Sequence, residues 1–227
     1  LLLAGVIVFV VTCLAAGEPR YAAAPGAKVM KLHGMTVDYS AAGEGYVCVR
    51  GSVGSGRLKL RVAKGDTVYT YDLPADGEYQ VFPLQMGSGA YSLALYEQVS
   101  GSRYAALSKA SLEVSLSGEN LPYLYPNQYV PYGPDTPAVQ ISMELCRGLA
   151  GDREKVEAVW DYVTTRHAYD HVLALTAQPD YLPDLCRVSD TGMGICLDFA
   201  ALFACMLRVQ DIPAQLVVGH ADDTYHA

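Results

Sequence analysis

The chain has 227 residues, which is enough for one large or two small domains, and hydrophobic residues make up 51% of it. This composition supports well-packed cores and excludes a disordered chain. The formal net charge is −8. A surface of that sign repels phosphate backbones, so nucleic acid is excluded as a partner.

The N-terminal segment has the composition of a targeting signal. Residues 1–16 carry no charged side chain, and the run falls short of the ~20 residues of a membrane-spanning helix. It therefore fits the apolar core of a signal peptide within residues 1–20. A membrane anchor is the alternative, because the chain starts at Leu1 and its true start is expected to lie upstream. Lipidation at Cys13 is a further alternative. Each reading predicts an exported protein, extracellular or at the cell surface.

Residues 28–118 have the pattern of an antiparallel β-sandwich of the Ig-like kind. Leu58, Leu60 and Val62 alternate with basic residues, which is the period of a half-buried strand. Lys64-Gly65-Asp66 predicts a turn into the next strand. We find no catalytic pattern in this region.

The pattern then becomes helical. Residues 119–136 are dense in Pro and Tyr and predict an ordered connector, because proline interrupts helices and central strands. A first helix is expected from about Thr136 to Gly151 and a second from Asp152, with Trp160 in the core.

The last part combines helix and strand. Residues 168–190 read as irregular, and Gly192-Met193-Gly194 leads into an apolar helix that stops before Asp211-Ile212-Pro213. Residues 214–219 predict a buried strand, and Tyr225-His226-Ala227 opens the next one. Residues 137–227 are therefore expected to form an α+β domain.

Six cysteines occur, and none belongs to a CxxC pair, so a zinc knuckle or a thioredoxin-type site has no support. Removal of a leader containing Cys13 would leave an odd number, which indicates one free thiol in an exported protein. Cys146 and Cys205 sit in apolar helical patterns and are expected to be core residues. Cys186 is ambiguous.

Cys196 occupies a position suited to nucleophilic chemistry. It lies in the first turn of a helix, directly after the glycine-containing loop, where free amide groups and the helix dipole favour a thiolate. Such amides can also hold an oxyanion. His226 follows after a helix, a strand and a turn, where it could take the thiol proton.

Three blocks of sequence carry a resemblance to a known family. They occur in the order G-x-C-x-D-F-A, R-x-x-D-I-P-A and Y-H-A, at Gly194-Ile195-Cys196-Leu197-Asp198-Phe199-Ala200, Arg208 to Ala214, and Tyr225-His226-Ala227. From about residue 122 the chain resembles bacterial exported proteins with a transglutaminase-like domain, which share the papain-like cysteine-enzyme core. The resemblance implies Cys196 as nucleophile and His226 as base, with no cofactor and no metal.

The resemblance also implies two family features that residues 1–227 do not contain. Asp211 stands where the family has Gly, and the family's third catalytic residue, an Asp that orients the imidazole, is expected beyond Ala227. The fragment itself is therefore expected to be inactive, with its domain truncated at the C-terminus. Asp198, Asp222 and Asp223 are better explained as first-turn and turn residues than as substitutes.

The reaction expected from the resemblance is acyl transfer from an amide through a Cys196 thioester, by a transglutaminase, amidase or peptidase. The expected substrate is a protein or peptide, including a cell-wall peptide. One alternative is a catalytically inert surface or cell-wall binding module. Another is a metal-dependent hydrolase that uses His220, His226 and Asp222.

Overall fold

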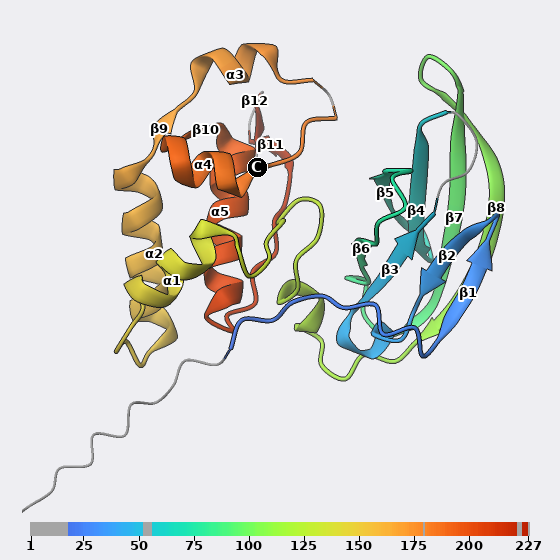
Figure 1. The fold of residues 1–227 in the computed structure, drawn as a ribbon, viewed down its shortest axis with the longest axis horizontal. Coiled ribbons are helices and arrows are strands. Elements are labelled where there is room, and N and C mark those ends of the chain that lie inside the picture. The colour runs from blue at the N-terminus through green and yellow to red at the C-terminus, as the bar shows by residue number, and fades with distance from the viewer. Residues whose placement is uncertain (1–17, 52–55, 179, 222–223, 227) are drawn as a thin grey trace, which may run out of the picture.

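The computed structural model describes residues 18–51, 56–178, 180–221 and 224–226. They form a mixed α+β structure in which strands on one side face helices on the other (Figure 1). Residues 1–17 of the predicted leader, with Cys13, lie outside the described residues. No helix within the described ranges is long and apolar enough to cross a bilayer.

The N-terminal part, here called the β unit, contains two four-stranded sheets with the orders β1-β2-β3-β6 and β5-β4-β7-β8. Every pair of neighbouring strands is antiparallel. The strands are β1 (Val29–Leu32), β2 (Met35–Asp38), β3 (Tyr46–Arg50), β4 (Leu58–Lys64), β5 (Thr67–Leu73), β6 (Gln80–Pro83), β7 (Gly89–Ser100) and β8 (Arg103–Val114), with a short 3₁₀ helix at Ala42–Glu44.

One hydrophobic core fills the β unit and draws residues from both sheets. The predicted alternation is confirmed, since Leu58, Leu60 and Val62 are all buried while their neighbours on β4 are less so. The predicted turn at Lys64-Gly65-Asp66 joins β4 to β5 as a hairpin. The antiparallel β structure is therefore confirmed, and the Ig-like assignment stays a prediction.

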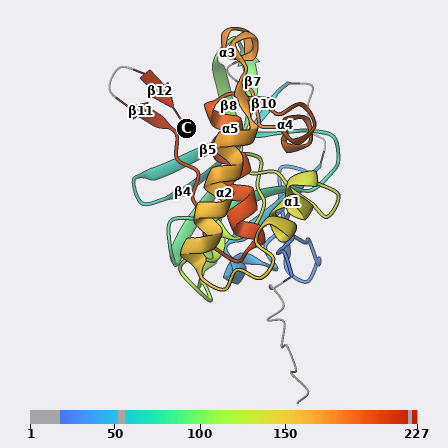
Figure 2. The same ribbon diagram turned by 90° about the vertical axis from the view of Figure 1, so that its left-hand side faces the viewer.

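The C-terminal part is built around one apolar helix, α5 (Cys196–Val209), which contacts three other helices. Figure 2 shows α2 and α5 side by side. The remaining elements are a 3₁₀ helix (Leu121–Tyr123), α1 (Pro137–Leu145), α2 (Asp152–Arg166), α3 (His171–Thr176), α4 (Leu185–Thr191) and the short strands β9 (Ala168–Tyr169), β10 (Met193–Gly194), β11 (Gly219–Ala221) and β12 (Thr224–His226).

Several predictions about this part were wrong in detail. Trp160 is not a core residue: 58% of its surface is exposed, because α2 buries the face of Val159 and Val163, and Trp160 lies beside that face in a T-shaped contact with Phe203. Residues 168–190 are not irregular throughout, since they hold α3 and α4. The predicted strand at 214–219 is absent over 214–218, because the N–H of Ala214 donates to the connector and strand pairing begins only at β11.

A buried arginine ties α5 to the connector, and an exposed ion pair joins the β unit to the helical part. The guanidinium of Arg208 on α5 donates to the carbonyls of Ala214 and Tyr125, so it ties the helix to the connector. Burial lowers the pKa of Arg208 to about 10, with Tyr132 and Cys205 acting in the opposite sense. Arg57 of the β unit forms a partly exposed ion pair with Asp180, which lies between α3 and α4.

Candidate functional site

Cys196 is the first residue of α5 and lies in the wall of a cavity of about 410 Å³. Its side chain is half-buried. The preceding residue, Ile195, has extended backbone and caps the helix. The nucleophile predicted from the sequence therefore stands at a helix N-terminus that opens into a cavity, where unpaired amides are available to a substrate oxygen.

The cavity has walls from both parts of the molecule. Asp72 of β5 and Tyr129 of the connector face a wall that includes Tyr169, Tyr181 and Cys196. The volume falls within the ~300–1,000 Å³ of ligand pockets, and apolar side chains interrupted by a few polar groups are typical of them.

Backbone contacts fix the loop before Cys196. Strand β10 pairs in parallel with β9, and the N–H groups of Ala168 and Asp170 donate to the carbonyls of Gly192 and Gly194. Gly192 ends α4 with a φ of +65°, a left-handed conformation that favours glycine. The first glycine of the motif therefore has a structural reason, which the sequence analysis had not identified.

Gly194 is required by close packing. A Cβ at this position would lie 2.8 Å from the Cβ of Asp198 and 3.1 Å from Cε1 of Phe199. The loop therefore lies directly on the first turn of α5, which it could not do with a larger residue.

We expect Gly194→Ala to destabilise the protein by about 1–3 kcal/mol, the range for overpacking a filled site, and to slow alkylation of Cys196. Gly133→Ala is the matched control, since a Cβ at Gly133 meets nothing within 4 Å and should be nearly silent. Urea denaturation and thiol labelling measure the two effects. Equal stability of the two variants would contradict the packing argument.

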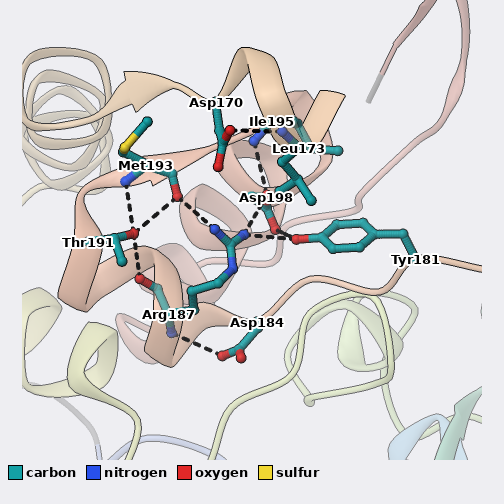
Figure 3. Close-up of polar contacts among 9 residues, drawn as sticks. All are labelled: Asp170, Leu173, Tyr181, Asp184, Arg187, Thr191, Met193, Ile195 and Asp198. Carbon is teal, nitrogen blue, oxygen red and sulfur yellow. Dashed lines mark hydrogen bonds and ion pairs between the residues drawn. The ribbon is translucent and has the colours of Figure 1, made fainter. Parts of the chain in front are cut away.

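Asp198 is the centre of a polar network under the loop (Figure 3). Its side chain is fully buried. One carboxylate oxygen accepts from the Tyr181 hydroxyl at 2.6 Å, and the other accepts from Arg187 Nη2 at 3.0 Å and from the N–H of Ile195 at 2.9 Å. Arg187 also donates to the carbonyl of Met193 at 3.3 Å. The network therefore holds the loop at both ends.

Two groups of this network, Tyr181 and Arg187, keep their protonation states near neutral pH. Burial, reinforced by the Asp198 carboxylate, raises the pKa of Tyr181 to about 12, so its hydroxyl remains a donor. Burial acts to lower the pKa of Arg187, but the contacts with Tyr181 and Asp198 outweigh it and raise that pKa. Arg187 therefore stays a cation beside the carboxylate.

The predicted base, His226, lies on β12, where its backbone is paired with Gly219 of β11. Its side chain is outside what the structure describes, as are those of His220, Asp222 and Asp223. The pairing of Cys196 with His226 accordingly stays a prediction, and so does the alternative metal site.

Two histidines near the site make structural contacts. The ring of His167 lies between Tyr162 and Phe199, with Nδ1 at 3.2 Å from the carbonyl of Val163. His171 packs against the ring of Tyr169. These contacts place His167 in an aromatic group beside the first turn of α5.

Neither Tyr181 nor Arg187 was predicted from the sequence, and Asp198 was predicted only as a first-turn carboxylate. The bond from Asp198 to the N–H of Ile195 agrees with that explanation. The other two contacts reach residues 17 and 11 positions away. No local spacing rule predicts them, and the only signal was a carboxylate in the first turn of a mostly apolar helix.

The five described cysteines are all free thiols. Cys48, Cys146 and Cys205 are buried, and burial raises the pKa of each, to about 12 for Cys48 and Cys205. Cys186 is exposed on α4. Cys196 is thus the one of these five thiols that is half-buried, lies at a helix start and lines its cavity.

Comparison with known proteins gives a family for this part of the chain. No curated protein and no solved structure matches the sequence. Residues 139–227, which include α5 and the loop before it, match the family model of the transglutaminase-like superfamily. The helical part of the chain with Cys196 therefore carries a transglutaminase-like domain, from a superfamily whose members are generally cysteine enzymes.

Proposed function

We propose that the protein is an exported cysteine acyl-transfer enzyme of papain-like core that acts on amide bonds of proteins or peptides. The observation that carries the proposal is the position of Cys196. Cys196 lines a cavity at the start of α5, within the segment that matches the transglutaminase-like superfamily.

In the proposed reaction the Cys196 thiolate attacks the carbonyl carbon of a substrate amide, and His226 holds the proton that the thiol has lost. Amides of the first turn of α5 stabilise the oxyanion of the tetrahedral intermediate. The C–N bond then breaks, the proton passes from His226 to the departing amine or ammonia, and a thioester remains on Cys196.

The thioester is resolved by a second nucleophile. An amine gives a new amide bond and water gives a carboxylate, and either one transfers its proton to His226 as the Cys196 thiolate leaves. Both outcomes belong to the same proposed chemistry, and the substrate glutamine side chain or peptide bond supplies the acyl group.

The test is the reactivity of the thiols towards iodoacetamide in the full-length gene product. We expect Cys196 to label rapidly even near pH 7, where an ordinary thiol with a pKa of ~8.5 reacts slowly. His226→Ala should remove that advantage. Mass spectrometry locates the label at each pH.

The exposed Cys186 provides an internal reference in the same sample, because it is an accessible thiol that also lies in the first turn of a helix, α4. The buried Cys48, Cys146 and Cys205 should label only after unfolding. If Cys196 reacts no faster than Cys186 and His226→Ala changes nothing, the proposed nucleophile is wrong.

A further inference from the structure

Strand β5 is an edge strand beside the helical part of the molecule. It ends the sheet order β5-β4-β7-β8 and pairs only with β4 among the described strands. Figure 1 shows β5 on the side of the β unit that faces α5. An edge strand of this kind presents backbone groups that a further strand can bind.

The hydrogen-bond pattern identifies which groups of β5 are open. The carbonyl of Asp72 accepts from Gln128 Nε2 at 3.1 Å, so Asp72 points its backbone away from β4. Alternation along an antiparallel strand gives Thr70 and Val68 the same direction. Within the described ranges, no residue makes a hydrogen bond to the outward N–H or C=O groups of these two.

The open edge of β5 lines a second cavity of about 380 Å³, which includes Val68, Tyr69 and Thr70. This cavity shares Tyr129 and Val218 with the cavity that contains Cys196. The two are therefore neighbours around the same pair of side chains, and a ligand on β5 is adjacent to the site of the proposed nucleophile.

We propose that an extended polypeptide segment of the substrate adds to the open edge of β5 and, past Tyr129, delivers its amide to Cys196. The inference rests on the proposed function and names its substrate as an extended chain rather than a small free amide. Backbone hydrogen bonds to Val68 and Thr70 supply affinity, as in other cases of strand addition.

The same geometry assigns a role to the β unit. Its core is separate from that of the helical part, yet its edge strand and the connector provide walls of both cavities. The β unit thus recognises the substrate, while α5 carries the reacting thiol.

The first test measures peptide binding by fluorescence anisotropy in the full-length Cys196→Ala protein, so that no turnover is needed. The probe is a labelled peptide with one glutamine and about four residues on each side, which extend at ~3.3 Å per residue. A second peptide of the same sequence carries N-methyl groups at alternate backbone nitrogens. We expect N-methylation in the pairing register to weaken binding by about tenfold or more, because lost backbone bonds cannot be replaced.

The second test changes the protein edge. Thr70→Pro removes the outward N–H without removing a bond to β4, a substitution that edge strands tolerate, and it should weaken peptide binding about as much as N-methylation does. Tyr96→Ala is the control, because Tyr96 lies outside both cavities, where Arg61 contacts its ring and hydroxyl. Circular dichroism checks that Thr70→Pro is folded.

The outcomes separate this inference from the proposed function. Binding that is equal for both peptides, or unaffected by Thr70→Pro, overturns the inference even if Cys196 is a reactive nucleophile. Binding that depends on both changes supports it even if Cys196 is not reactive. A change in self-association rather than in peptide binding would assign the edge to a second copy of the chain and would also overturn it.

Discussion

Replacing Cys196 with alanine is expected to abolish acyl transfer, with a loss well beyond the ~10²–10⁴-fold that one acid–base group contributes. No thioester can form without the sulfur, and the cavity offers no second thiol among the described residues that line it. Ammonia release from a glutamine peptide and incorporation of a fluorescent amine by the full-length gene product measure the effect.

The matched control for this prediction is Cys186→Ala. Cys186 is an exposed cysteine on α4 that does not line the cavity of Cys196, so its removal should leave turnover unchanged. His226→Ala should reduce turnover by ~10²–10⁴-fold, as expected for loss of a general base. Turnover that survives in Cys196→Ala but disappears on metal chelation would instead favour the metal-dependent alternative.

Replacing Asp198 with alanine should lower the free energy of unfolding by about 3 kcal/mol. Removing one partner of a buried ion pair costs ~3–5 kcal/mol, and the lower end applies because 31% of the Arg187 side chain remains exposed to solvent. The change also leaves the Tyr181 hydroxyl and the N–H of Ile195 without their acceptor. Urea denaturation of wild type and variant gives the difference.

The partner variants show whether the loss is specific. Arg187→Met should lose at least as much as Asp198→Ala, because it leaves the fully buried Asp198 carboxylate without its cation. The double variant should lose less than the sum, because the two side chains share one interaction. The labelling rate of Cys196 is a second measurement, which a change in stability alone does not affect. A displaced loop should alter the labelling rate of Cys196, while the labelling rate of Cys186 stays constant. A loss below about 1 kcal/mol for Asp198→Ala would mean that solvent replaces the network.

Local features of this protein could be predicted from the amino-acid sequence. Alternation at Leu58, Leu60 and Val62 predicted β4 because strand period and burial are both properties of a short segment. The glycine loop and the apolar run after it placed Cys196 at the start of α5, as the structure has it. The three sequence blocks also indicated the transglutaminase-like domain that the family comparison supports.

How these elements pack against one another depends on long-range contacts. Trp160 has helical spacing that fits a core residue, but α2 buries Val159 and Val163 and leaves 58% of Trp160 exposed. The apolar stretch at 214–218 had the composition of a buried strand, yet it runs along the connector without a described strand partner. Burial depends on which face a neighbour covers, and periodicity within one element carries no information about that neighbour.

The same limit applies to the candidate site. The bonds from Asp198 to Tyr181 and Arg187 join side chains from separate elements, and the cavity of Cys196 is also lined by Asp72 from the β unit and Tyr129 from the connector. These contacts are set by packing of the β unit against the helices. The sequence could therefore single out Cys196 as a candidate nucleophile, whereas the walls around it follow from long-range contacts that exist only in the folded chain.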